Sequence, residues 1–467
     1  MQMNTLLPRH SRKPGAATFR GVRPPRRWLL ACAVALAIPL PALADSVTDW
    51  NALASGPTVL PRFGAPQQTT RAMAIVQIAV HDALNSIQPR YQSYNNLPPA
   101  LAGASPDAAV AAAARTALLG LMAALPAAPT PAEAANRAAA VAAITAAFDA
   151  ALGPGAYSDA EVKGIAAGDA AAAAILAARA ADGSATPHSP AYALAAAAGI
   201  HQATPAPEFP AQTTPLFTGW PNVTPFGVNS ASQFRSPPGQ IFDLTSARYA
   251  SEYNQVKHQG NARVRGAFPN SQQSDIARFW PGGGLEWNAN ARLIASGLGM
   301  DQWQHARLFA LMNISTADAL ITNLESKYLY NFWRPVTAIR WANDGNPNTV
   351  SDPTWRPFLQ TPPYPDYPCA STSMTGAAAG TLRLFFGTNS AGFTRTVTAP
   401  AVPLPAPMTE LPPKVITRHY GSLSIAENEQ ARARVYAGIH YIEGCYAGLR
   451  MGNQIAGFNF ANYLRPL

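Results

Sequence analysis

The chain has 467 residues, of which 48% are hydrophobic and 13% are charged. This composition is sufficient for one large core or two adjoining ones, and it excludes a disordered or fibrous protein. The formal net charge is +9, but seven positive charges and no acid lie in residues 1–44, so the remainder carries only about +2. The basic balance is therefore no argument for binding nucleic acid, and we predict no such partner.

Residues 1–44 have the features of an export signal. A basic start precedes the apolar run WLLACAVALAIPL, and Ala42-Leu43-Ala44 forms a small-residue cleavage site before Asp45. The run is about a dozen residues long, whereas a membrane span needs roughly 20, so we predict cleavage after Ala44 and no stable membrane span afterwards. The pair Arg26-Arg27 leaves twin-arginine and general export both open. The mature protein is expected to be exported, either periplasmic or secreted.

The first expected helix covers residues 71–87, RAMAIVQIAVHDALNSI, whose apolar residues recur at spacings of three and four. We predict a helix that is buried on most of its surface, with His81 in the core. An alanine-rich stretch at 108–181 predicts closely packed helices, because alanine has high helix propensity and little bulk. Residues 187–284 are rich in Pro, Gly, Ser and aromatic residues, and they predict long loops with short helices near 245–259.

Helices are expected to resume near Asn288 and to end at Pro335, because proline lacks the backbone N–H that a helix interior needs. A further helix should start near Ser371, followed by a proline-rich loop at 387–413. The pair Ser424 and Glu427 resembles a capping box that opens the last helical region.

No strand pattern of comparable strength appears, so the predicted class is all-α. We expect residues 45–285 to form an N-terminal helical region with long loops. Residues 286–467 should form a C-terminal helical bundle.

The first segment with informative polar residues is SKYLYNFWRP, residues 326–335. Lys327 and Arg334 are seven residues apart, or about two helical turns, so a continuous helix would place them on one face. Two cations on one face repel each other unless an anion lies between them. The alternative is that both side chains extend over their aromatic neighbours to solvent.

The second segment, PDYPCASTSMTG at 365–376, opens a helix with small and hydroxylated residues. Free backbone N–H groups and the positive end of the helix dipole favour anion binding at such a start. An ordinary N-cap formed by Ser or Thr is the alternative.

The third segment, ARVYAGIHY at 433–441, contains Arg434 and His440, and Gly438 leaves space near the histidine. Six residues on a helix separate the two side chains by about 120°, a gap that a long guanidinium can bridge. Arginine donates several hydrogen bonds to an oxyanion, and a neutral imidazole nitrogen can attack phosphorus or ligate a metal. On its own, such a pair is usually structural.

Together the three segments resemble the vanadium haloperoxidases and their relatives in the type 2 phosphatidic acid phosphatase superfamily. The first motif of that family, Lys, six residues and Arg-Pro, is complete as KYLYNFWRP. The third, Arg, three residues, Gly, one residue and His, is complete as RVYAGIH. The second, Pro-Ser-Gly-His, is altered to Pro-Cys-Ala-Ser at 368–371. The resemblance is specific over residues 303–457.

The resemblance implies two packed helical bundles of the vanadium chloroperoxidase and acid phosphatase type, with an oxyanion near their centre. Lys327, Arg334 and Arg434 would pair with the equatorial oxygens of bound vanadate, the implied cofactor. Backbone groups at Cys369 and Ala370 would donate to the same oxygens. His440 would bond to vanadium or, in a phosphatase, attack phosphorus.

Three departures from the family pattern affect these roles. Ser371 stands where the family has its acid/base histidine, and general acid/base help is commonly worth roughly 10² to 10⁴ in rate. Gly444 stands where the family has an acid four residues after the last histidine, although Glu443 is adjacent. Cys369 replaces a serine and would either contact the oxyanion or pair with Cys445, so a disulfide and two free thiols both stay open.

Three functions follow from this pattern. The first is an exported vanadate-dependent haloperoxidase-like enzyme that oxidises halide with hydrogen peroxide, in which His440 and Ser371 are the catalytic candidates. The second is a phosphatase that acts on a phosphate ester through a phosphohistidine at His440. The third is a non-catalytic relative that binds oxyanions. The sequence leaves open whether the chain forms a homo-oligomer.

Overall fold

The computed structural model describes residues 45–467 except 154, 189–191, 193–195, 207–208, 213 and 281–285. The predicted export signal at residues 1–44 lies outside the described residues. Within the described part of the chain, none of the helices combines the length and the apolar character that crossing a membrane requires.

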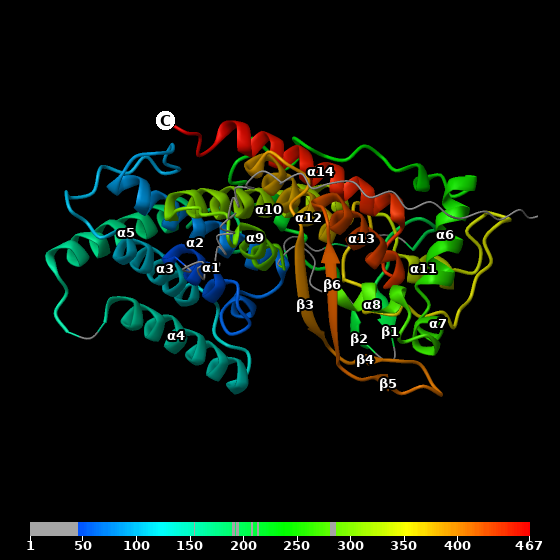
Figure 1. Cartoon of the computed structure of the whole chain (residues 1–467). Coiled ribbons are helices and arrows are strands. Elements are labelled where there is room, and N and C mark those ends of the chain that lie inside the picture. The colour runs from blue at the N-terminus through cyan, green and yellow to red at the C-terminus, as the bar shows by residue number, and fades with distance from the viewer. Residues whose placement is uncertain are drawn as a thin grey trace, which may run out of the picture. The chain divides into compact units, whose positions relative to one another are not determined.

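The fold is all-α in its main elements, as predicted (Figure 1). Its helices are α1 Ser46–Ala54, α2 Pro66–Ile87, α3 Pro106–Ala123, α4 Pro131–Leu152, α5 Asp159–Ala178, α6 Ala247–Gln259, α7 Ala262–Ala267, α8 Gln272–Phe279, α9 Trp287–Ala295, α10 Gln302–Tyr330, α11 Pro335–Arg340, α12 Ala370–Phe386, α13 Leu423–Tyr436 and α14 Ile442–Asn462. Short 3-10 turns lie at η1 Leu60–Phe63, η2 Trp220–Asn222 and η3 Gln240–Phe242.

The alanine-rich stretch forms closely packed helices, as its composition predicts. Helices α3 and α5 approach so closely that a Cβ added at Gly164 or Gly168 would overlap the backbone of α3. Alanine and glycine make this approach feasible because they carry almost no side-chain volume. Helix α4 is largely exposed and buries mainly Ala140, Ile144 and Phe148.

Helix α10 is the central element of the molecule. It begins with a capping box between Asp301 and Gln304, and nearly all of its residues are buried. It packs against α2 from the N-terminal half and against α12 and α14 from the C-terminal half (Figure 1). Helices on both sides of residue 285 therefore share one core, and the domain division expected there stays a prediction.

Small strands occur where only loops were expected. Strands β3 Phe393–Ala399 and β6 Lys414–Tyr420 pair antiparallel in continuous register, and β4 Val402–Pro403 pairs with β5 Glu410–Leu411 in the same hairpin. In β3 and β6 the buried and exposed residues alternate, which is the period of a half-buried strand. The many prolines between the two strands masked this alternation in the sequence. A second two-stranded sheet joins β1 Thr204–Ala206 and β2 Phe209–Gln212.

The last helical region begins two residues earlier than the capping box predicts. Ser422 is the N-cap of α13, and its side chain accepts a hydrogen bond from the backbone N–H of Ile425. Ser424 instead contacts the side chain of Asn389. The predicted capping box with Glu427 is therefore wrong, because Glu427 pairs with Arg383 on α12.

Candidate active site

Lys327 lies in the last turn of α10 and is fully buried. Its Nζ donates hydrogen bonds to the carbonyl oxygens of Pro365, at 2.7 Å, and Asp366, at 2.6 Å. Burial and the nearby Arg334 guanidinium hold the pKa of Lys327 well below its ordinary value. The alternative in which this side chain extends to solvent is therefore wrong.

Arg334 does not share a helix with Lys327, contrary to the prediction. Helix α10 ends at Tyr330, and its C-cap Asn331 adopts a left-handed conformation with φ of 52°. Arg334 is the N-cap of α11, and Pro335 occupies the first position of that helix, where its missing N–H costs nothing. Pro335 therefore opens a new helix after the break instead of ending α10.

The Arg334 guanidinium is fully buried and bonded to backbone on two sides. Its Nε donates to the carbonyl oxygen of Tyr364 at 2.8 Å, and its Nη1 donates to that of Ile439 at 2.9 Å. Nη2 has no hydrogen-bond partner among the described residues. Burial lowers the pKa of Arg334, while Asp366 acts in the opposite direction. The side chain thus has one donor group left for a ligand.

His440 also lies outside a helix, so the predicted helical angle between it and Arg434 does not apply. Helix α13 ends at Tyr436, and Gly438 turns the chain with φ of +79°. A Cβ at Gly438 would overlap the carbonyl oxygen of Gly260, so this glycine gives room to the neighbouring backbone as well as permitting the turn.

The turn places the His440 imidazole in the interior beside Arg334 and Asp366. Arg334 Nη1 lies 2.9 Å from His440 Nε2 and 3.3 Å from Nδ1. Asp366 Oδ1 lies 2.9 Å from His440 Nδ1. The first and third sequence motifs therefore meet in one buried cluster.

Arg434 lies in the last turn of α13 and is 6% exposed. Its Nη1 donates to the carbonyl oxygen of Trp280 at 3.0 Å, while its Nε has no partner in the described part of the chain. Arg434 is close enough to Arg334 to lower the pKa of that guanidinium by repulsion. Three cations thus converge on one buried region.

The N-terminus of α12 lies in this region, because its N-cap residue Cys369 contacts His440. Cys369 is the N-cap, and no side chain caps the helix there. The backbone N–H of Cys369 donates to the carbonyl oxygen of Gly444 at 2.9 Å, and the role of this amide as an oxyanion donor stays a prediction. The backbone N–H of Ala370 has no hydrogen bond to any described residue, and it lies at the positive end of the 17-residue helix.

Ser371 is buried and held by α13. Its Oγ accepts a hydrogen bond from Gln430 Nε2 at 3.1 Å, and Gln430 lies one helical turn before Arg434. Gln430 Oε1 in turn accepts from Trp287 Nε1 and from the Thr375 hydroxyl. Because Ser371 Oγ serves as an acceptor, its own proton remains available to a ligand.

Cys369 and Cys445 are both free and buried, so the disulfide is not formed in this structure. Burial raises the pKa of the Cys445 thiol well above its ordinary value. Burial acts in the same direction on Cys369, but the hydrogen bond with Cys445 and the nearby His440 outweigh it and lower the pKa of Cys369. Cys369 is therefore the more acidic thiol of the pair.

Two residues of this region were not predicted from the sequence. Asp366 lies two residues before the altered second motif, outside all three motifs, and its carboxylate lies 2.9 Å from His440 Nδ1. His201 belongs to a loop whose backbone pairs with residues 331–333. Burial together with Arg334 and Lys327 lowers the pKa of His201 to about 3. No sequence signal marks His201, because its place depends on pairing between remote segments.

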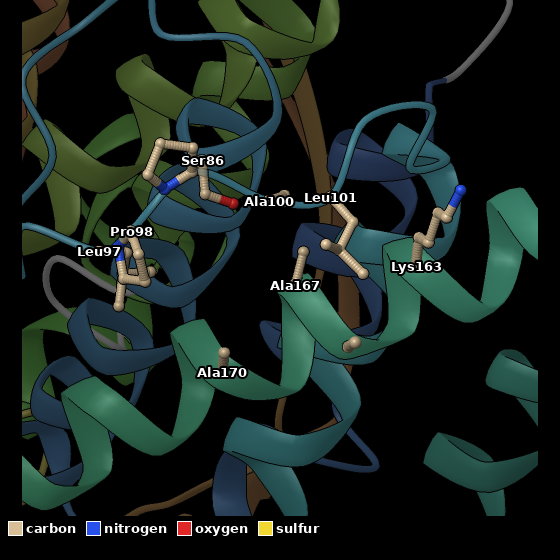
Figure 2. Close-up of a pocket in the computed structure, with 10 residues that line it drawn as sticks. Ser86, Leu97, Pro98, Ala100, Leu101, Lys163, Ala167 and Ala170 are labelled. Carbon is tan, nitrogen blue, oxygen red and sulfur yellow. The ribbon is translucent and has the colours of Figure 1, made fainter.

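A separate pocket of about 180 Å³ lies between the loop after α2 and helix α5 (Figure 2). Its walls are mainly apolar and include Leu97, Leu101 and Ala167, with Lys163 at one side. None of the predicted site residues lines it. The candidate active site is therefore distinct from this pocket.

Comparisons with known proteins show which proteins this chain is similar to. A family model described as the VCPO second helical-bundle domain matches residues 307–466. The chain is 31% identical over 170 residues to vanadium chloroperoxidase from Curvularia inaequalis, a match that covers 29% of this chain and 27% of that protein. The match thus spans about a quarter of the length of this curated relative.

Solved structures extend the likeness over most of the chain. The first bacterial vanadium-dependent iodoperoxidase aligns with a TM-score of 0.70 at 21% identity, covering 92% of this chain and 98% of that one. A holo-type bacterial vanadium-dependent chloroperoxidase aligns with a TM-score of 0.65 at 17% identity, covering 87% and 94%. At these identities the structural likeness establishes the fold.

Proposed function

Because the chain belongs to the superfamily of vanadium haloperoxidases and type 2 phosphatidic acid phosphatases, we propose that it is a vanadate-dependent haloperoxidase-like enzyme. The proposal includes export directed by residues 1–44 and oxidation of halide by hydrogen peroxide. It assigns Lys327, Arg334, Arg434 and His440 to the vanadate site, with Ala370 and Ser371 as further donors.

One observation carries the proposal. Lys327, Arg334 and Arg434 are buried around His440, and Asp366 is the acid that contacts this group. Buried charges are costly unless they are paired, so an excess of buried cations indicates a site built for an anion. Arg334 Nη2 and Arg434 Nε have no partners among the described residues, and both are suitable donors to a tetrahedral oxyanion.

The residues present fit vanadate in charge and in donor type. Arginine, lysine and a free helix N-terminus donate hydrogen bonds to oxyanion oxygens, and neutral imidazole is a common metal ligand. For Nε2 of His440 to serve as that ligand, Arg334 Nη1 must exchange its present contact with Nε2 for one to the oxyanion. The guanidinium would retain its two backbone bonds, so this exchange needs only a small movement.

When bound, vanadate would supply the centre at which hydrogen peroxide is activated for attack by halide. The protein holds this group by its cations, which favour the charged oxygens and withdraw electron density from them. Ser371 can donate a hydrogen bond from its hydroxyl group to an oxyanion oxygen, because its oxygen already accepts one from Gln430. The buried position of all these groups limits competition from water.

A phosphatase is the second candidate, and Ser371 argues against it. Phosphoryl transfer from an ester requires a proton for the leaving group, and serine is a poor proton donor near neutral pH. Burial beside Arg334 and Lys327 lowers the pKa of the His201 imidazole, which favours its neutral form over the protonated form that a leaving group needs. Ester hydrolysis is therefore expected to be slow.

The test uses purified protein with and without added vanadate. We expect peroxide-dependent oxidation of iodide, bromide or chloride only when vanadate is present, and we expect His440→Ala to reduce it to the level of the solution without protein. His258→Ala is the matched control, because His258 is exposed and should leave the activity unchanged. Hydrolysis of p-nitrophenyl phosphate is measured in parallel.

Each outcome separates the candidates. Full halide oxidation by His440→Ala would contradict the assigned site. Hydrolysis that vanadate inhibits, without halide oxidation, would replace the proposal with the phosphatase. Binding of vanadate with neither activity would indicate a non-catalytic relative.

A further inference from the structure

Asp366 is the acid at the centre of the cationic cluster. It is fully buried, its Oδ1 lies 2.9 Å from His440 Nδ1, and the same oxygen lies 3.7 Å from Arg334 Nη1. Neither carboxylate oxygen receives a hydrogen bond of regular geometry from any described residue. No described residue therefore occupies the carboxylate with a regular hydrogen bond. Of the two side chains named, the His440 imidazole lies closer to Asp366 than the Arg334 guanidinium does.

The backbone around Asp366 fixes this position. Its N–H donates to the carbonyl oxygen of Phe332 at 2.8 Å, and its carbonyl oxygen accepts from Lys327 Nζ at 2.6 Å. The backbone of Asp366 is thus anchored by Phe332 and Lys327. A carboxylate anchored in this way can orient the ring that it contacts.

The contacts of His440 determine which ring nitrogen carries its proton. Arginine can only donate hydrogen bonds, and Arg334 Nη1 lies nearer to Nε2, at 2.9 Å, than to Nδ1, at 3.3 Å, so this contact favours Nε2 as the acceptor. In the neutral ring the proton then resides on Nδ1, the nitrogen that faces Asp366. This tautomer leaves the Nε2 lone pair directed away from the carboxylate, and a ligand can bind it once Arg334 Nη1 exchanges its contact with Nε2 for one to the ligand.

The carboxylate at this place comes from a different part of the chain than the family pattern implies. Position 444, which is acidic in the family, is glycine here, and a Cβ added there would lie 3.3 Å from Asp366 Oδ2. Asp366 therefore covers the space in front of Gly444. Glu443 does not serve this role, because its carboxylate accepts hydrogen bonds from the backbone N–H groups of Gln240 and Ile241.

We propose that Asp366 is the positioning residue of His440, and that it replaces a carboxylate at position 444 by holding the imidazole in its Nδ1-protonated form with Nε2 unprotonated. In this position a carboxylate orients a metal-binding histidine and strengthens its basicity. The inference rests on the proposed function for its consequence in vanadate binding. Its effect on the imidazole itself is independent of any ligand.

The first experiment uses the ligand-free protein. Two-bond ¹H–¹⁵N correlation spectra of protein with ¹⁵N-labelled histidine, at one fixed pH, show which nitrogen of His440 carries the proton, and His440→Ala assigns the signal. We expect Nδ1–H in the native protein and a loss of this preference in Asp366→Asn, which keeps the shape but removes the charge. An unchanged tautomer in Asp366→Asn would overturn the proposal.

The second experiment measures vanadate binding by calorimetry. It asks whether a carboxylate at position 444 can replace the one at position 366. Asp366→Ala is expected to weaken vanadate binding by about 10- to 100-fold, the usual effect of removing a carboxylate behind a metal ligand. The double variant Asp366→Ala/Gly444→Asp should recover most of this loss, because the shorter side chain at 366 opens the space beside position 444. Glu443→Gln is the matched control and should bind as the native protein does.

The outcomes distinguish this inference from the proposed function. Equal affinity of Asp366→Ala and native protein would overturn the positioning role, as would a loss that the double variant fails to recover while both variants keep the native unfolding temperature. If the native protein binds no vanadate, the proposed function fails, and the histidine spectra alone then decide the role of Asp366.

Discussion

At the scale of single residues, the candidate site combines groups that would be unstable together without a ligand or a strong framework. Lys327 and Arg334 are fully buried, and both have lowered pKa values because burial disfavours their charge. Four carbonyl oxygens accept hydrogen bonds from these two cations and compensate part of that cost. The sequence motifs predicted which cations lie together in the interior. The contact of Asp366 with His440 could not be predicted, because it joins two segments that are remote in sequence.

His201 gives a prediction about stability and pH. Its pKa is about 3 in the folded protein and 6.5 ordinarily, so between these values the unfolded chain binds more protons than the folded chain. Stability must therefore decrease as the pH falls below 6.5, by up to about 1.4 kcal/mol per pH unit from this one group.

The measurement compares native protein with His201→Gln by chemical unfolding at pH 6.5 and pH 4.5. The native protein should lose roughly 2–3 kcal/mol more than the variant over this interval, because glutamine does not titrate. Equal losses would show that the His201 imidazole becomes protonated without cost, contrary to its burial beside Arg334 and Lys327.

At the scale of elements, the candidate site residues lie mainly at the ends of helices and not along their faces. Lys327 precedes the end of α10, Arg334 opens α11, Ala370 opens α12 and His440 follows the end of α13. Periodicity predicted the bodies of these helices correctly, whereas the breaks at Asn331 and Gly438 were missed. A left-handed Asn is a weak signal in sequence, because asparagine also occurs inside helices.

The contact between α12 and α14 gives a prediction about packing. Gly452 on α14 lies against α12, and a Cβ there would overlap the carbonyl oxygen of Ser373. Gly452→Ala should therefore lower the free energy of unfolding by about 1–3 kcal/mol, because the helices must move apart. Gly457 lies on the same helix with open space around it, so Gly457→Ala should be neutral or stabilising by about 0.5–1 kcal/mol.

Urea unfolding of both variants measures this difference. The two substitutions have the same helix propensity effect, so their difference reports the overlap at Gly452 alone. Equal stabilities would mean that α12 and α14 separate without cost, and the close approach of these helices would then have no structural importance.

At the scale of the whole molecule, one core holds segments that are far apart in sequence. Helix α10 contacts α2, α12 and α14, so residues near 80, 320, 375 and 450 share an interior. Helical class and the C-terminal bundle could be predicted from composition, periodicity and motifs. The hairpin of β3 and β6 and the loop that carries His201 could not, because their pairing depends on partners distant in sequence.

This arrangement predicts that an oxyanion stabilises the molecule as a whole. A ligand that joins α10, α12 and α13 binds the folded chain and not the unfolded one, and at 100 times its dissociation constant it contributes about 2.7 kcal/mol. For a chain of this length, that corresponds to an increase of about 3 °C in the unfolding temperature.

Differential scanning calorimetry with and without vanadate measures this increase. Arg434→Met should abolish the increase, whereas Arg432→Met, an exposed position on the same helix, should retain it. An equal increase in both variants would mean that vanadate stabilises the protein at some other place, since the only difference between them is whether the lost guanidinium faces the buried cluster or the solvent.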